Sequence, residues 1–253
     1  MDSQPAQPLQ NKVALVTGAG RGIGRAIALG YADAGAAVCC AARTRHEIET
    51  VAGAINQSGG RAVAAICDVR DYGSVQAATE AAVAAFGGLD IVVINAGVNL
   101  ALSSIAEGDP QRWAETIEVN LIGAYHCIKA ALPHLRVNGG HIITIGSGRG
   151  HRADPGRTAY SSSKAGLSML TRAAAEEVWP ERICVNELIP GPVLTDMMQQ
   201  SAAQQASSIN LHYDREWLKP SEAVAPLAVW IAATDPATGP TGQSFSLMRR
   251  DAL

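Results

Sequence analysis

The feature that most constrains the fold is a regular alternation between short apolar runs and longer segments with helical periodicity. Apolar runs of strand length lie at residues 13–18, 37–43, 62–69, 90–97, 141–147, 183–190 and 243–248. Helix candidates lie between them, near residues 22–34, 45–58, 71–86, 110–135, 158–179 and 221–233. This β-α-β alternation predicts a parallel sheet with helices on both faces, in which the strands are continuously apolar. The sequence therefore predicts an α/β, doubly wound fold with a seven-stranded parallel sheet.

The chain length is compatible with one domain, because a chain of 253 residues can still share one core around a single sheet. We therefore expect one domain over residues 1–253. Residues 1–11 lack the charged start and apolar run of a signal peptide, and we expect them to form a flexible N-terminus. Residues 195–220 are rich in Gln, Ser and Ala, which favours a mobile lid over a substrate.

Charge and cysteine content restrict the partners and the compartment. A formal net charge of -3 and a pI near 6.1 give no attraction for nucleic acid or an anionic membrane, so a small molecule is the expected partner. No apolar stretch reaches membrane-spanning length. The five cysteines show no C-x-x-C spacing, which indicates reduced, structural thiols and predicts a cytoplasmic protein.

A glycine-rich turn follows the first predicted strand, in the sequence TGAGRGIG. Gly18, Gly22 and Gly24 lie where a strand turns tightly into a helix whose N-terminus can face a pyrophosphate. The commoner G-x-G-x-x-G template does not fit, because Ile23 occupies the place of its third glycine. The spacing G-x-x-x-G-x-G in this context still predicts a dinucleotide site of the Rossmann type.

The end of the second strand bears on which dinucleotide binds. NAD-binding folds usually carry an acidic residue there for the ribose hydroxyls, whereas a 2′-phosphate requires a cation. This strand ends at Ala42, and Arg43 and Thr44 follow it, while Arg21 in the glycine loop is a second cation near the same region. Guanidinium groups suit phosphate, so NADP(H) is the preferred cofactor and NAD(H) the alternative. Solvated surface arginines would give the same pattern.

A tyrosine and a lysine are placed for acid–base chemistry. Tyr160 and Lys164 lie four residues apart, which puts both side chains on one face of a helix. A neighbouring ammonium stabilises the phenolate of tyrosine, whose pKa is otherwise about 10. Ser147 lies thirteen residues upstream at the end of a predicted strand, where a parallel sheet forms its ligand crevice.

The chain resembles the short-chain dehydrogenase/reductase family, and more specifically its carbonyl reductases, from Lys12 to Met248. The motifs that carry the resemblance are TGAGRGIG, CDV around Asp68, NAG at 95–97, Asn120 in VNLIG, Ser147, YSSSK at 160–164 and PGPVLT at 190–195. The resemblance implies that Tyr160 is the general acid/base, Ser147 holds the substrate oxygen, Lys164 binds the nicotinamide ribose and lowers the tyrosine pKa, and Asn120 supports a water-linked proton relay. It assigns Asp68 to the adenine and Val193 and Thr195 to the nicotinamide carboxamide.

The expected site therefore has a catalytic and a cofactor-binding part. The catalytic set is Asn120, Ser147, Tyr160 and Lys164. The cofactor set is Gly18, Arg21, Gly22, Ile23, Gly24, Arg43, Thr44, Asp68, Val69, Asn95, Ala96, Gly97, Tyr160, Lys164, Pro190, Gly191, Val193 and Thr195. Purely structural roles remain open for three residues: Asp68 as a helix cap, Asn120 at a helix kink and Ser147 in a loop. We expect no catalytic metal, because His126, His134 and His141 lack ligand spacing.

The expected activity is NADP(H)-dependent interconversion of a ketone or aldehyde and an alcohol, and two other functions remain as alternatives. One is a 3-oxoacyl-[acyl-carrier-protein] reductase. In the reductases of that kind that the chain resembles, two arginines meet the acidic carrier, and Pro133 and Glu176 align with them here. The other alternative is a catalytically silent dinucleotide sensor or scaffold, which the complete catalytic set disfavours.

Two further regions bear on substrate and assembly. Arg149, His151, Arg152 and Arg157 crowd the loop at 148–157, where they would orient an anionic or polar ketone or simply be solvated. The helices at 110–135 and 158–179 carry more apolar surface than one side of a sheet can cover, and relatives pair these helices across two-fold axes. We therefore expect a homotetramer, with a dimer as the alternative.

Overall fold

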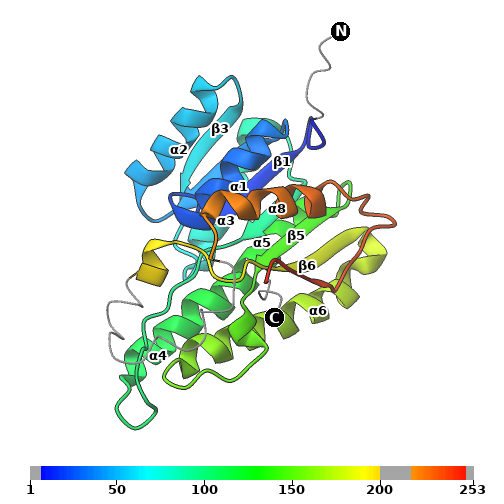
Figure 1. Cartoon of the computed structure of the whole chain (residues 1–253). Coiled ribbons are helices and arrows are strands. Elements are labelled where there is room, and N and C mark those ends of the chain that lie inside the picture. The colour runs from blue at the N-terminus through cyan, green and yellow to red at the C-terminus, as the bar shows by residue number, and fades with distance from the viewer. Residues whose placement is uncertain (1–6, 200–217, 249–253) are drawn as a thin grey trace, which may run out of the picture.

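The sheet has the predicted architecture. The computed structural model describes residues 7–199 and 218–248. In this part of the chain, seven parallel strands form one sheet in the order β3-β2-β1-β4-β5-β6-β7, which confirms the doubly wound Rossmann fold (Figure 1). The strands are β1 (Val13–Thr17), β2 (Ala37–Ala42), β3 (Arg61–Ile66), β4 (Ile91–Ile94), β5 (Gly140–Ile145), β6 (Ile183–Ile189) and β7 (Ser244–Ser246).

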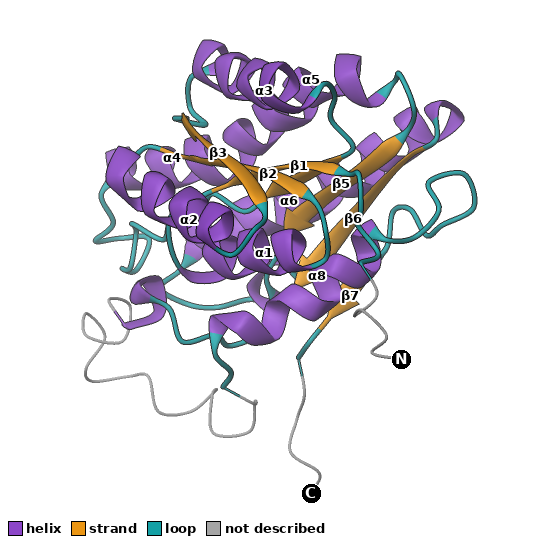
Figure 2. Cartoon of the chain, turned by 90° about the horizontal axis from the view of Figure 1, so that it is seen from above, coloured by secondary structure: helices purple, strands orange, loops and turns teal. Residues whose placement is uncertain are grey.

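Helices cover both faces of the sheet, and Figure 2 shows the sheet between them. They are α1 (Gly22–Asp33), α2 (Arg45–Gln57), α3 (Tyr72–Phe86), α4 (Pro110–Ile117), α5 (Gly123–Leu135), α6 (Thr158–Val178) and α8 (Ala225–Ala232), the last preceded by a 3-10 turn at Ser221–Val224. One core layer joins α1, α2 and α8 to the sheet, and the other joins α3, α5 and α6 to it.

The strand β1 illustrates why the apolar runs are continuous. All five of its residues are buried. Val13 and Leu15 belong to the core under α3 and α5, whereas Ala14 and Val16 belong to the core under α1 and α8. Successive side chains of a strand point to opposite faces, so a strand covered on both sides needs an apolar residue at every position.

The segment predicted as one helix over 110–135 is divided, which corrects that expectation. Between α4 and α5 the chain forms a π-helical turn at Glu118–Ile122, with Asn120 at its centre. Such a turn inserts one extra residue into the helical ladder, and π turns occur frequently at functional sites. The periodicity of the sequence does not reveal it, because the apolar stripe continues on either side of the turn.

The topology places a crevice at one edge of the sheet. The chain order of the strands reverses between β1 and β4, and ligands of open α/β sheets bind at the carboxyl ends of strands beside such a reversal.

Two segments were expected from the sequence to be flexible or mobile. Leu9, within the segment expected to be flexible, is buried and its amide donates to the Ala34 carbonyl, so the described end of that segment is anchored. Most of the expected lid, residues 200–217, lies outside the described residues.

Candidate active site

A cavity of about 550 Å³ opens at the carboxyl ends of the strands, within the usual size range of small-molecule and cofactor sites. It brings together nearly every residue that the sequence assigned to the site. Those lining it are Gly18, Arg21, Gly22, Ile23, Arg43, Thr44, Asp68, Val69, Asn95, Ala96, Gly97, Ser147, Tyr160, Lys164, Pro190, Gly191, Val193 and Thr195. Gly24 and Asn120 do not line the cavity but lie behind its wall.

The glycine loop is shaped by close backbone contacts. Gly18 adopts a φ of 64°, a left-handed conformation that glycine reaches without strain. The first turn of α1 then passes so near the loop that a Cβ on Gly24 would collide with the carbonyl oxygen of Gly18. The Asn95 side chain donates to the carbonyls of Thr17 (2.9 Å) and Gly18 (3.2 Å), which ties the end of β4 to the end of β1. Gly24 therefore acts through packing and Asn95 as a clamp.

The loop leaves a helix N-terminus available to an anion. The residue before α1, Arg21, makes no side-chain cap to the first-turn amides, and Gly22 (φ 54°) keeps side-chain bulk away from them. Unsatisfied amides and the helix dipole favour a pyrophosphate at this position. The residues present therefore fit a dinucleotide, with Gly18 and Gly22 forming the cradle.

Three charged groups surround the region where an adenosine ribose would lie. Arg43 lines the cavity directly after β2. Arg21 also lines it, but its guanidinium pairs with Asp196 at 3.2 Å, and both side chains are largely exposed. An exposed pair of this kind is weak, so Arg21 can exchange partners. Glu47, on the first turn of α2, brings a carboxylate to the same wall, against Gly20. The sequence analysis did not identify this acidic residue.

Asp68 is a cavity residue and not the cap of the next helix. The cap of α3 is Asp71, whose carboxylate accepts from the Gly73 amide at 3.0 Å. The Asp68 carboxylate instead accepts from the backbone amide and the guanidinium of Arg70. These bonds, with a smaller contribution from the charge of Arg43, hold the pKa of Asp68 below its usual range despite partial burial. Asp68 is thus an oriented, ionised acceptor in the cavity wall.

Ser147, Tyr160 and Lys164, which are expected to be catalytic, line the same cavity. The Lys164 Nζ lies 5.8 Å from the centre of the Tyr160 ring and donates to the carbonyl of Ile145 at 2.8 Å. Lys164 is almost completely buried, and this burial lowers its pKa to about 8, although the negative charge of Glu187 opposes the shift. The Ser147 hydroxyl accepts from the Arg149 amide at 3.2 Å, so its own proton is available to a substrate oxygen.

Asn120 supports this arrangement from the π turn. Its side-chain amide exchanges two hydrogen bonds with the backbone of Val98, each 2.8 Å long, and it also donates to the Ser163 hydroxyl. It therefore fastens the segment after β4 to the helix that carries Tyr160. Asn120 also has the structural role that was open for it at a helix kink, and this kink is the π turn at Glu118–Ile122.

The segment after β6 forms another wall of the cavity. Lys219 is fully buried and donates to the carbonyls of Pro190 (2.7 Å) and Pro192 (3.3 Å), which fixes the turn that carries Gly191 and Val193. Met248 also reaches the cavity, where its side chain packs against Gly148 and Gly191. Met248 was not among the site residues expected from the sequence.

The loop between β5 and α6 brings several cations to the cavity. Asp154 pairs with Arg149 and with Arg157, the latter at 3.1 Å. Burial opposes ionisation of Asp154, but the bonds from these two guanidinium groups outweigh it and lower the pKa of the carboxyl. Arg149, Arg152 and Arg157 all line the cavity, as does Arg112 at the start of α4. Sequence analysis missed Arg112, which is distant in the chain.

Within the described residues, no group of three His, Cys, Asp or Glu side chains is arranged to hold a metal ion. No helix in that part of the chain combines the length and apolarity needed to cross a membrane. All five cysteines are free and buried, and burial raises the thiol pKa values, to about 12 for Cys39 and about 11 for Cys184. They therefore serve as core residues in this structure.

Comparisons with known proteins agree with this geometry. A family model described as short chain dehydrogenase matches residues 12–206. A short chain dehydrogenase/reductase of Aspergillus oryzae is 38% identical over 247 residues, which are 94% of each chain. A 3-oxoacyl-[acyl-carrier-protein] reductase of Staphylococcus aureus is 38% identical over 188 residues, 74% of this chain and 76% of that protein. A solved structure of an NAD+-bound xylitol dehydrogenase superimposes with a TM-score of 0.88 at 25% identity, covering 95% of this chain and 99% of the other. The chain belongs to the short chain dehydrogenase family of oxidoreductases.

Proposed function

We propose that this protein is an NADP(H)-dependent oxidoreductase that interconverts a ketone or aldehyde and an alcohol, with Tyr160 as general acid and base. The observation that carries the proposal is the shared cavity: the Tyr160 ring with the Lys164 ammonium beside it, Ser147, and the glycine loop all line one space. A bound nicotinamide cofactor would supply or accept the hydride.

The side chains of Ser147, Tyr160 and Lys164 orient the carbonyl and carry out the proton transfer. During reduction, Ser147 donates a hydrogen bond to the carbonyl oxygen, and Tyr160 transfers its proton to that oxygen as negative charge develops. The Lys164 ammonium stabilises the resulting phenolate. One of its three N–H groups is used by Ile145, which leaves two for ribose hydroxyls or water.

The test is hydride transfer from NADPH to a panel of reactive ketones, comparing the parent with Tyr160→Phe. The substitution keeps the ring and removes the transferable proton, so turnover should fall by at least about 1,000-fold. Folding and NADPH binding should persist, and both are measured in parallel. Lys164→Met should weaken NADPH binding as well as turnover. If Tyr160→Phe remains within a few-fold of the parent, another proton donor operates and this proposal is wrong.

The NADP(H) preference is supported by Ala42 and Arg43, which place a cation and no carboxylate at the end of β2. Glu47 opposes the NADP(H) preference, and the similar xylitol dehydrogenase was solved with NAD+, so NAD(H) remains the competing cofactor.

Location and assembly are further proposals, and the cytoplasmic location stays a prediction. For assembly, the exposed apolar side chains Ile122, Tyr125 and Met169 lie on the π turn, on α5 and on α6, and they support the proposed tetramer. Light scattering that gives a monomer at micromolar concentration would rule it out.

A carrier-protein reductase is the second candidate, favoured by the Staphylococcus aureus relative. Against it, Pro133 and Glu176, which the sequence analysis aligned with the carrier-binding arginines, are both exposed and neither is cationic. We therefore keep the free small-molecule carbonyl as the proposed substrate. Equal turnover of a ketone free and attached to acyl-carrier protein would support this assignment, whereas a strong preference for the attached ketone would favour the reductase.

A further inference from the structure

A buried carboxylate lies directly behind the proposed catalytic residues. Glu187 lies in β6 and is only 1% exposed, and its neighbours Asn186 and Leu188 are completely buried. An ionised carboxylate in such an environment is very costly unless it is hydrogen-bonded and paired. Nothing in the sequence indicated this arrangement, because Asn186 and Glu187 are two polar residues within an otherwise apolar strand.

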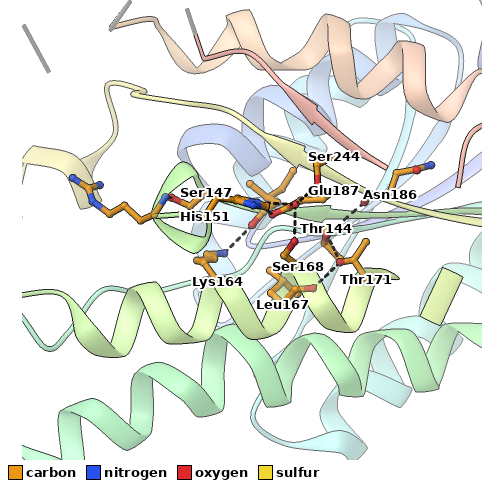
Figure 3. Close-up of polar contacts among 12 residues, drawn as sticks. Thr144, Ser147, His151, Lys164, Leu167, Ser168, Thr171, Asn186, Glu187 and Ser244 are labelled. Atoms are coloured by element: carbon orange, nitrogen blue, oxygen red, sulfur yellow. Dashed lines mark hydrogen bonds and ion pairs between the residues drawn. The ribbon is translucent and has the colours of Figure 1, made fainter. Parts of the chain in front are cut away.

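Donors from three other elements converge on this carboxylate (Figure 3). Ser168 of α6 donates to Oε2 at 3.1 Å, Ser244 of β7 at 2.5 Å, and the His151 ring contacts it at 3.2 Å from the loop after β5. The strand end beside it is also shaped for it, since a Cβ on Gly146 would collide with Oε1. Glu187 therefore occupies a polar site within the core in which hydrogen-bond donors surround its carboxylate.

The same helix face carries both the donor to Glu187 and the proposed catalytic pair. Tyr160, Lys164 and Ser168 are spaced four residues apart on α6, so their side chains form one stripe. Within it, Lys164 donates to Ile145 of β5 and Ser168 donates to Glu187 of the neighbouring strand β6. Lys164 is almost completely buried, and desolvation favours its neutral form. A buried negative charge on the neighbouring strand is the feature that counteracts this effect.

We propose that Glu187 is a positioning residue of the active site, whose buried negative charge keeps the Lys164 ammonium protonated beside Tyr160 at neutral pH. The inference rests on the proposed function in that Tyr160 and Lys164 carry out the proton transfer. Burial alone would lower the Lys164 pKa further than about 8, and the charge of Glu187 raises it in part. Loss of that charge would therefore leave Lys164 neutral over more of the physiological pH range.

Other charged groups near this site do not produce the same effect at the alkaline end. Tyr160 faces Lys164 from the same helix, and His151 is the titratable contact of Glu187 from the loop. Among the described residues, Glu187 is the charged group whose negative charge raises the Lys164 pKa. Arg149 and Asp154 on that loop pair with each other, and β7 contributes only the neutral Ser244.

The experiment compares Glu187→Gln with Ser244→Ala. Glu187→Gln keeps the size and one acceptor oxygen but removes the charge, whereas Ser244→Ala removes a hydrogen bond and keeps the charge. The Lys164 pKa is read by NMR titration of protein labelled with ¹³C-lysine, with Lys164→Met for assignment. The second readout is the pH profile of kcat/KM for NADPH-dependent ketone reduction. Thermal unfolding is measured for every variant.

Glu187→Gln should lower the Lys164 pKa by about one unit and move the alkaline limb of the profile down equally. Ser244→Ala should leave both near their parent values, and Glu187→Asp should restore them in part. If Glu187→Gln does not fold, Glu187→Met replaces it, because an apolar residue of similar volume is often tolerated in place of a buried charge.

An unchanged Lys164 pKa in the neutral variants, or an equal shift in Ser244→Ala, would overturn the inference and leave Glu187 a structural cross-link. The NMR readout needs no turnover. If the parent reduces no carbonyl but the Lys164 pKa still falls in Glu187→Gln, the electrostatic coupling holds and the proposed function fails.

Discussion

The glycine-loop half of the cavity and the half formed by residues 147–157 are held in place by different interactions. In the first, Gly24 packs against the backbone of Gly18, and Asn95 clamps two strand ends through backbone carbonyls. In the second, ionised side chains dominate: Asp154 binds two arginines, and His151 contacts a buried carboxylate. The first half should therefore tolerate changes of pH and salt, whereas the second should be sensitive to both. Added atoms are restricted in both halves, since a Cβ on Gly150 would also collide with the Lys164 backbone.

The largest expected effect comes from adding one methyl group to the glycine-loop half. Gly24→Ala would force the Cβ into the Gly18 carbonyl, and we expect a loss of stability of about 3 kcal/mol together with loss of cofactor binding. The matched control is Gly53→Ala on α2, where no atom lies within 4 Å of the added Cβ. There alanine should stabilise the helix by about 0.5–1 kcal/mol. Urea unfolding and NADPH titration measure both effects, and equal stabilities of the two variants would contradict the packing argument.

An intermediate effect is expected from removing one charge in the other half. Asp154→Asn weakens the bonds to Arg149 and Arg157, and we expect a cost of about 1 kcal/mol at pH 7, since solvent screens part of this cluster. The pKa of Asp154 is lowered in the folded protein, so its contribution is present above the unfolded pKa near 3.8 and is lost as pH falls through the folded value. The stability difference should therefore persist at pH 6 and vanish in acid. A difference that stays constant down to pH 3 would exclude an electrostatic origin.

The smallest expected effect concerns an electrostatic contribution within the glycine-loop half of the cavity. It tests whether charge also matters in the half that is held mainly by packing. Glu47→Gln removes a carboxylate from the wall near Arg43 and should raise NADPH affinity about threefold at low salt, with little change for NADH. Glu49→Gln is the control, because Glu49 pairs with Arg45 on the same helix and does not line the cavity.

The same binding measurements test the cofactor preference itself. The parent should bind NADPH more tightly than NADH, with a gap that narrows at high salt, and Ala42→Asp with Arg43→Leu should reverse the order. Equal affinities of the parent for the two cofactors would defeat the NADP(H) proposal. If Glu47→Gln raises the affinity for NADH as much as the affinity for NADPH, Glu47 does not interact with the 2′-phosphate.

Sequence alone determined the features that depend on local periodicity. Buried strands such as β1 are apolar at every position, and the helices between them repeat their apolar residues at helical spacing. The glycine loop and the Tyr160–Lys164 pair are likewise local, because a tight turn and one helical turn each involve only a few consecutive residues. For these, φ/ψ restrictions and the repeat lengths of helix and strand are sufficient.

Only the tertiary structure decided which distant residues meet. Glu187 is 36 residues from His151 and 57 from Ser244 along the chain, and their contact depends on how β6, β7 and the 148–157 loop pack together. The placement of Glu47 against Gly20 and of Met248 in the cavity wall has the same origin. The π turn at Asn120 also depends on such contacts, since its side chain bonds to Val98 and Ser163 on other segments. Such contacts leave no periodic trace in the sequence, because strand register and helix packing create them after the local elements have formed.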